Sequence, residues 1–115
     1  MSATLPKLER LSGRTAIATL VSKGRWERSE HLRCCYIAGN GLEYSRLMVS
    51  VPKKFFKRAV RRNLLKRRMR EAYRLQKELL GAGYDILLNY NFPEPVAFDV
   101  IYAEVTGLLA KISGR

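Results

Sequence analysis

The sequence is poor in the residues from which disulfide scaffolds and metal centres are built. It contains two cysteines and one histidine among 115 residues. Cys34 and Cys35 are adjacent, so a disulfide between them would be strained, and the chain offers neither of them another partner. A structural zinc site needs about four ligands at separated positions. We therefore expect no disulfide scaffold and no metal bound by the protein alone.

Candidate catalytic residues are equally scarce. A Cys–His pair would have to use His31, and a single histidine in a strand is more often a packing or surface residue. Paired carboxylates and a nucleophilic triad cannot be assembled from the sequence either. The sequence thus predicts a protein without catalytic residues of its own.

The chain also lacks a long apolar segment. No apolar run approaches the roughly 20 residues that span a bilayer. The start, from Met1 to Pro6, lacks the cationic segment and apolar stretch of a signal peptide. Apolar residues make up 47 % of the chain, enough for one core at this length. We expect one domain over residues 1–115 in a soluble, cytoplasmic protein.

Acidic residues are few, and the resulting positive charge is concentrated in one segment. The chain has 22 Lys and Arg against 10 Asp and Glu, a net charge of +12. From Lys53 to Lys77 it carries twelve of these basic residues and a single acid, Glu71. Such a concentration of one sign indicates a polyanionic partner.

The hydrophobic pattern predicts a mixture of helices and strands. Helices are expected over about 12–22, 56–80 and 98–112, and strands over 25–28, 31–38, 44–51 and 84–90. Glycines follow the first two helices, where they favour termination. The turn sequence Gly39-Asn40-Gly41 predicts that strands 31–38 and 44–51 pair as an antiparallel hairpin.

The long helix has two different faces. At 100° per residue, a sector of about 120°, the width of a core-facing stripe, holds Leu65, Met69, Ala72, Tyr73, Gln76, Leu79 and Leu80. A separate row, flanked by Lys66 and Lys77, consists of Asn63, Arg67, Arg70 and Arg74. Like charges at this spacing repel one another, which disfavours a merely solvated face. The row therefore predicts an anion-binding surface.

RNA is the polyanion that these residues favour. A membrane-surface helix would need its apolar face for insertion, but here that face must cover the sheet. The pattern shows neither a helix-turn-helix nor a basic region leading into heptads, which disfavours DNA. Arginine predominates over lysine in the helix and suits bidentate phosphate contacts and stacking on bases.

One segment of the long helix resembles a known family. Arg62-Asn63-x-x-Lys66-Arg67-x-x-Arg70-Glu71 is similar to the basic helix of the bacterial ribonuclease P protein subunit, and Ser50-Val51-Pro52-Lys53-Lys54 is similar to the strand end that precedes it. The order of the expected elements is similar over nearly the whole chain. Two departures stand out: Leu64 takes a position where the family usually has Arg, and Ile17 and Val21 stand where the first helix usually presents aromatic residues.

The resemblance implies a fold and a function. The fold would be α+β, a compact, ribosomal-protein-like α/β sandwich with the order α-β-β-β-α-β-α. The basic helix would make an unusual left-handed crossover between parallel strands. The protein would be the accessory subunit of an endoribonuclease whose catalytic RNA coordinates Mg²⁺ and removes the 5′ leader of precursor tRNA. Its partners would be that RNA subunit and precursor tRNA, with no DNA and no membrane.

The resemblance also implies two sets of RNA contacts. The RNA-binding set comprises Lys53, Lys54, Arg58, Arg62, Asn63, Lys66, Arg67, Arg70 and Arg74. The leader would lie in a cleft between the first helix and the sheet, with candidates Ile17, Val21, Cys35 and Tyr36. Because neighbouring strand residues point to opposite faces, only one of Cys35 and Tyr36 can line that cleft.

Two other classes of function remain open from the sequence. One is an RNA-binding or ribosome-associated protein without any enzymatic partner, which would share the basic helix. The other is a membrane-surface or chaperone-like basic protein. Cleavage of precursor tRNA by a reconstituted complex separates the first class from a ribonuclease subunit, and binding to vesicles tests the second.

Overall fold

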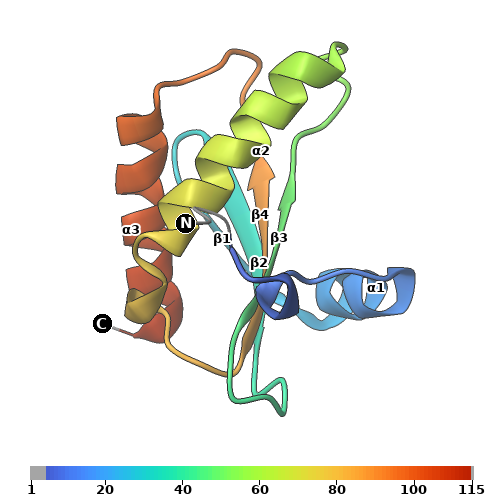
Figure 1. Ribbon diagram of the computed structural model, residues 1–115, viewed down its shortest axis with the longest axis vertical. Helices are drawn as coiled ribbons and strands as arrows, with labels where there is room; N and C mark the ends of the chain where they lie inside the picture. Colours follow the sequence, from blue (N-terminus) through green and yellow to red (C-terminus); the bar gives the residue numbers. More distant parts are fainter. Residues whose placement is uncertain (1–4, 115) are drawn as a thin grey trace.

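A computed structural model describes residues 5–114, which are built around one four-stranded sheet (Figure 1). The strands are β1 (Arg25–Arg28), β2 (Leu32–Ala38), β3 (Arg46–Ser50) and β4 (Tyr84–Tyr90), in the spatial order β1-β2-β4-β3. The pairs β1–β2 and β2–β4 are antiparallel, and β3–β4 is parallel. The helices are α1 (Arg14–Lys23), α2 (Ala59–Arg74) and α3 (Phe98–Ser113). Short 3₁₀ turns lie at Lys7–Glu9 and Lys77–Leu79.

The predicted hairpin between strands 31–38 and 44–51 is wrong, because β4 lies between them. β4 is buried on both faces from Ile86 to Tyr90. Such a strand buries the most apolar surface when it lies in the centre of a sheet that is covered on both sides. The turn residues Gly39 and Gly41 do adopt positive φ. They begin a connection that passes the end of β4, so β2 and β3 become its two neighbours.

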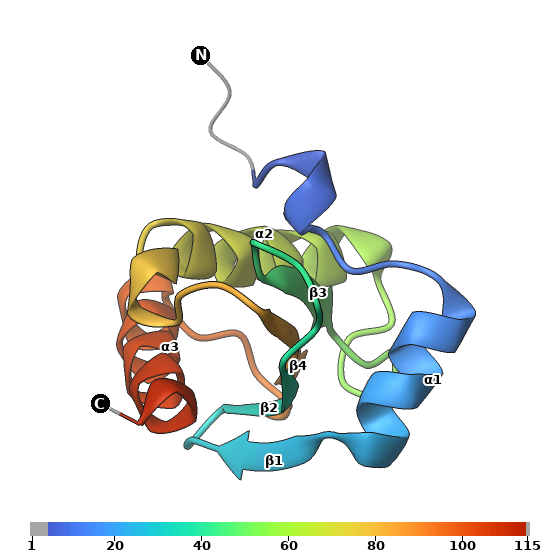
Figure 2. The same ribbon diagram turned by 90° about the horizontal axis from the view of Figure 1, so that it is seen from below.

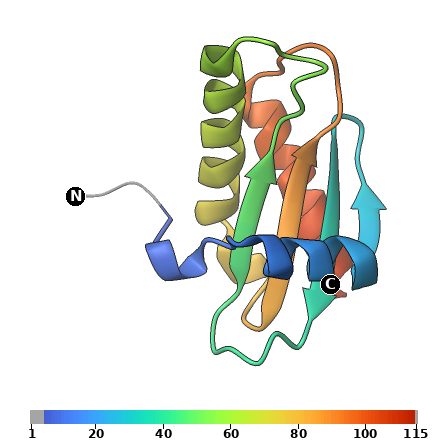
Figure 3. The same cartoon turned by 90° about the vertical axis from the view of Figure 1, so that its right-hand side faces the viewer.

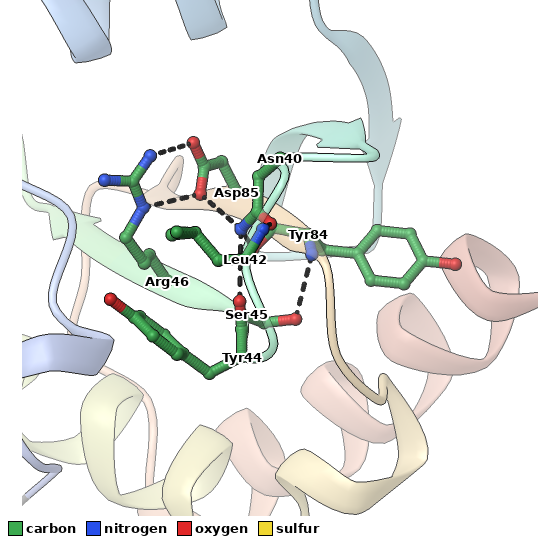
Figure 4. Close-up of polar contacts among 7 residues, drawn as sticks. All are labelled: Asn40, Leu42, Tyr44, Ser45, Arg46, Tyr84 and Asp85. Carbon is green, nitrogen blue, oxygen red and sulfur yellow. Dashed lines mark hydrogen bonds and ion pairs between the residues drawn. The ribbon is translucent and has the colours of Figure 1, made fainter.

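A polar network secures this connection (Figure 4). The Arg46 guanidinium donates to both oxygens of Asp85, from Nε at 2.9 Å and from Nη2 at 2.7 Å. The Asn40 amide donates to the same carboxylate at 3.0 Å. Ser45 accepts a hydrogen bond from the Tyr84 backbone N–H at 3.0 Å. Because Arg46 and Asp85 are also register partners, the ion pair fixes where β3 pairs with β4.

The crossover from β3 through α2 to β4 is left-handed, as expected. In Figure 3 the face that carries α1 is toward the viewer, β3 and β4 both point upward, and β4 lies to the right of β3. The helix α2 lies on the far side of the sheet (Figure 2). Right-handed connections predominate for such parallel pairs, so this topology is an exception to a general rule.

The core lies between the sheet and the helices α2 and α3. The predicted core-facing stripe of the long helix is confirmed. Leu79 is half-buried, and all other members are buried: Leu65, Met69, Ala72, Tyr73, Gln76 and Leu80. The helix itself is shorter than predicted. It begins at Ala59, after the extended Arg58, and ends at Arg74. Beyond that end, the buried Gln76 side chain is held by α3, donating to the Tyr102 carbonyl at 3.0 Å.

The single histidine joins the β1–β2 turn to α3. His31 is buried, its ring meets Phe92 edge-on with centroids 4.5 Å apart, and its Nδ1 lies 2.5 Å from the Glu104 carboxylate. Its backbone N–H donates to the other oxygen of Glu104 at 2.8 Å. His31 therefore has the packing role that the sequence favours.

The opposite face of the sheet is only partly covered, by α1. The small hydrophobic cluster between α1 and the sheet consists of the buried residues Leu11, Leu20, Cys35 and Leu87. The close approach requires glycine at the end of α1, because a Cβ on Gly24 would lie 2.4 Å from the Cys35 sulfur. Figure 3 shows that α1 crosses β3, β4 and β2, leaving part of this sheet face uncovered.

The Arg46–Asp85 pair should make stability depend on pH. Burial raises the pKa of Asp85, but hydrogen bonds from Arg46 and Asn40 outweigh it, so its pKa lies below the ordinary value. The stabilisation is complete above the unfolded pKa of about 3.9 and is lost as the pH falls through the lower folded pKa. Asp85→Asn should cost about 1–2 kcal/mol of unfolding free energy at neutral pH.

Urea unfolding at a series of pH values measures this difference. We expect the gap between wild type and Asp85→Asn to close as the pH falls below about 4. Glu43→Gln changes an exposed carboxylate in the same connection and should leave stability unchanged. A gap that stays constant with pH would show that the Asp85 charge is not its source.

Candidate nucleic-acid interface

The outer side of α2 and the segment before it present a row of cations. Since Leu65 and Met69 face the core, residues on the other side of the helix project away from it. Exposed residues of the predicted RNA-binding set are Lys53, Lys54, Arg58, Asn63 and Arg67, and half-buried ones are Arg62, Lys66, Arg70 and Arg74. The structure thus places the predicted set on α2 and on the segment that joins β3 to it.

Three arginines of this helix have partners within the protein. Arg62 donates from Nη1 to the carbonyls of Phe56 and Lys57, both at 2.8 Å, and so holds the turn before the helix. Arg68 donates to the Val96 carbonyl at 2.8 Å, which ties α2 to the loop before α3. Arg74 forms an ion pair with Glu71 one turn earlier. These arginines have a structural role in addition to their charge.

Lys66 and Arg70 line a cleft between α2, β3 and the segment before α1. This cationic cleft has a volume of about 250 Å³ and is lined by Arg10, Leu11, Ser12, Leu47, Met48, Val49, Lys66 and Arg70. None of its lining residues is acidic. Burial lowers the pKa of Arg70, and the neighbouring charges of Arg10 and Arg67 lower it further. An anion in the cleft would relieve this repulsion.

Arg10 is a member of the cleft that sequence reasoning missed. It lies next to Leu11, whose backbone N–H donates to the Leu47 carbonyl at 2.8 Å, so the segment extends the sheet beyond β3. The Arg10 guanidinium donates to the Leu5 carbonyl at 3.2 Å. No local pattern around Arg10 signals this position, because it results from pairing with a strand far along the chain.

The leader candidates are only partly brought together. Ile17 is half-buried and Val21 is 44 % exposed on α1. Cys35 does face α1, but its side chain is fully buried and its thiol donates to the Leu20 carbonyl at 3.2 Å. Tyr36 packs on the opposite face with the main core. Cys35 therefore lines no open cleft, because α1 packs directly on it. Tyr36 faces the other side of the sheet, where it lines a hollow of about 400 Å³ that Lys23, at the end of α1, also reaches.

The fold and this surface define a small basic α+β protein with one strongly cationic helix face. A family model described as Ribonuclease P matches residues 5–113. A protein of Porphyromonas gingivalis named ribonuclease P protein component is 42 % identical over 103 residues, which cover 88 % of this chain and 73 % of that protein. One of the same name from Thermotoga petrophila is 35 % identical over 120 residues, covering 99 % of this chain and all of that protein. The chain belongs to the ribonuclease P protein family.

Solved structures agree with this assignment. The ribonuclease P protein from Thermotoga maritima superposes with a TM-score of 0.80 at 32 % identity, covering 90 % of this chain and 97 % of that one. The protein from Staphylococcus aureus gives a TM-score of 0.78 and covers 91 % and 94 %, and at 23 % identity it supports the fold alone. The fold class inferred from the basic-helix motif is confirmed. Within residues 5–114 there is no helix with the length and apolarity to cross a membrane.

Proposed function

We propose that this chain is the protein subunit of a cytoplasmic ribonuclease P, which binds a catalytic RNA subunit and the 5′ leader of precursor tRNA. As a family member it takes part in tRNA processing. In the proposed complex, RNA catalyses the Mg²⁺-dependent endonucleolytic cut that gives the mature 5′ end. The protein assists by binding both RNAs and by supplying positive charge where they meet.

The observation that carries this proposal is the cationic cleft beside the exposed row of α2. Lys66 and Arg70 meet Arg10 there without an acidic residue among the lining groups. Arg67 adds its exposed guanidinium on the same helix. Closely placed, unneutralised guanidinium groups bind phosphates well because each offers several N–H donors in a planar fork. The arrangement favours a phosphate backbone over a single small anion, because the cations continue from the cleft along the helix.

We assign the chemical step to the RNA subunit. Among residues 5–114, no three His, Cys, Asp or Glu side chains are grouped as the ligands of a metal ion would be. His31 is buried, and its ring contacts Glu104 and Phe92. When bound by the RNA, Mg²⁺ would activate water and stabilise the leaving oxygen. The side chains of this chain hold and orient phosphates.

Reconstitution tests the proposal directly. The protein combined with a ribonuclease P RNA should cleave precursor tRNA at the mature 5′ end and should lower the Mg²⁺ concentration that the RNA requires. The protein alone should not cleave. Tight RNA binding without any effect on cleavage would favour the alternative of an RNA-binding protein with no enzymatic partner, and cleavage by the RNA-free protein would contradict the assignment of catalysis.

Removing two charges from α2 should weaken binding in a salt-dependent way. For Arg67→Ala combined with Arg70→Ala, we expect a weaker complex with the RNA subunit and a shallower dependence of log K on log salt. The slope should fall by about 0.7 to 0.9 for each phosphate that the variant no longer neutralises. Lys23→Ala, an exposed charge at the end of α1, should leave the slope unchanged. Weaker binding at an unchanged slope would show that the arginines do not contact phosphates.

Leu64 is predicted to be a vacant phosphate-binding position. It is 40 % exposed and lies beside the basic row, outside the stripe that packs on the core. Leu64→Arg should therefore change stability by no more than about 0.5 kcal/mol. It should also strengthen RNA binding and steepen the salt slope by about 0.7 to 0.9, because one more phosphate is neutralised. Thermal melting and RNA titration of the same variant check both results, and a large loss of melting temperature without a gain in affinity would contradict them.

A further inference from the structure

Beyond α1, a polar row crosses the sheet on the same face; its Arg28 is exposed, its Arg33 and Ser50 are half-buried, and its Asn89 is buried. Residues directly opposite one another on paired strands share a face. The pairings Arg28 with Arg33, Arg33 with Asn89, and Asn89 with Ser50 therefore make one row across all four strands. Arg33 is two residues from Cys35 and shares its face, but it lies beyond the residues that α1 buries. Figure 3 shows this part of the sheet above α1, between β3 and β1.

The only tryptophan of the chain stands at the β1 end of this face. Trp26 pairs with Cys35 and so points to the side of the sheet that carries α1, but it remains 44 % exposed. The Arg33 guanidinium lies 5.1 Å from the centroid of the indole ring. Its Nε donates to the Asn89 side-chain oxygen at 2.9 Å. Asn89 therefore holds the Arg33 guanidinium beside the indole in a cation–π contact.

A positively charged hollow lies beside this pair at the β1 edge of the sheet. Lys111 reaches it from α3 on the opposite face, where its Nζ donates to the Arg28 carbonyl at 3.4 Å. Its volume is about 380 Å³, within the range of small-ligand pockets, and its lining residues are Trp26, Glu27, Arg28, Arg33 and Lys111. The lining of the hollow therefore carries three basic side chains and one acidic side chain. An exposed indole with cations around it matches the chemistry of single-stranded nucleic acids, in which bases offer π-faces and the backbone offers phosphates.

We propose that Trp26 and Arg33 form a base-stacking subsite for one nucleotide of single-stranded RNA, at the β1 side of the sheet and distinct from the cationic cleft. Under the proposed function, on which this inference rests, that RNA is the part of the 5′ leader farther from the cleavage site. The base stacks on the indole and guanidinium, and Arg28 and Lys111 attract the flanking phosphate. The exposed large apolar residue of α1, Val21, is aliphatic, so Trp26 supplies the stacking that α1 cannot.

The position of the subsite makes its use depend on leader length. Adjacent strands are about 4.8 Å apart, so the row from β3 to β1 spans roughly 14 Å. A leader that enters beside α2 reaches Trp26 only after crossing β4 and β2. We therefore expect a leader of about ten nucleotides, within the site sizes of single-strand binders, to use the subsite. A leader of one nucleotide should not reach it.

The fluorescence of the single tryptophan reports occupancy of the subsite. Stacking of a base on the indole should quench its emission when the free protein is titrated with a single-stranded oligoribonucleotide, and when the reconstituted complex receives precursor tRNA with the long leader. Mature tRNA should leave the emission unchanged. Absence of quenching by both the oligoribonucleotide and the long-leader precursor would overturn the proposal.

Substitutions test how much Trp26 and Arg33 contribute to the affinity for the long-leader precursor. Trp26→Ala should weaken binding of the long-leader precursor by roughly 5- to 100-fold, as expected for one base stacked on an aromatic ring. Trp26→Phe should retain most of the affinity for this precursor, because a phenyl ring can also stack on a base. Arg33→Lys keeps the charge but loses the planar stack, so it should show a partial loss. The control Val100→Ala shortens an exposed apolar side chain on α3 and should bind normally.

The outcomes separate this inference from the proposed function. Equal affinity of wild type and Trp26→Ala for the long-leader precursor would overturn the subsite, as would equal losses for long-leader, short-leader and mature substrates. Binding of single-stranded RNA that Trp26→Phe preserves and Trp26→Ala weakens would support the subsite even if the reconstituted complex failed to cleave. That failure would contradict only the proposed function.

Discussion

The structure depends on β4 being buried from both sides. Leu88 and Tyr90 contribute to the core beneath α2 and α3, and Leu87 contributes to the cluster beneath α1. A strand that is apolar on both faces is stable only in the centre of a sheet covered on both sides. This requirement places β3 beside β4 in a parallel pair and makes α2 the crossover between them. The orientation of the basic helix therefore follows from the position of the most buried strand.

The cationic surface has an energetic cost in the free protein. Like charges one helical turn apart destabilise a helix by a few tenths of a kcal/mol per pair, and α2 contains one acid, Glu71, which pairs with Arg74. The charges of Arg10, Arg67 and Arg70 remain close to one another. The apolar stripe of α2 offsets this repulsion by packing in the core. Because that packing fixes the cations in place, an anionic partner meets a surface that is already arranged.

The arginines of this protein have two kinds of role, and the charge pattern alone does not separate them. Arg62 and Arg68 hold backbone carbonyls near the ends of loops, and Arg46 holds the register of two strands. Arg58 and Arg67 are exposed on the cationic side. A guanidinium has five N–H donors, so Arg62 can hold a turn and still present charge to an external phosphate. Its place in the family motif is therefore compatible with both functions.

Local sequence was sufficient to place the helices and strands to within a few residues, except for the end of α2, to distinguish the two faces of that helix and to identify the family. These features depend on periodicity and on a motif within one helix. Folding of the whole chain was needed to establish that β4 separates β2 from β3, that Arg10 joins Lys66 and Arg70, and that Cys35 is buried by α1 while Trp26 stays exposed. Each of these depends on contacts between segments distant in the chain. Glycine-rich turn chemistry predicts that the chain bends, but burial of the whole sheet selects which strands become neighbours.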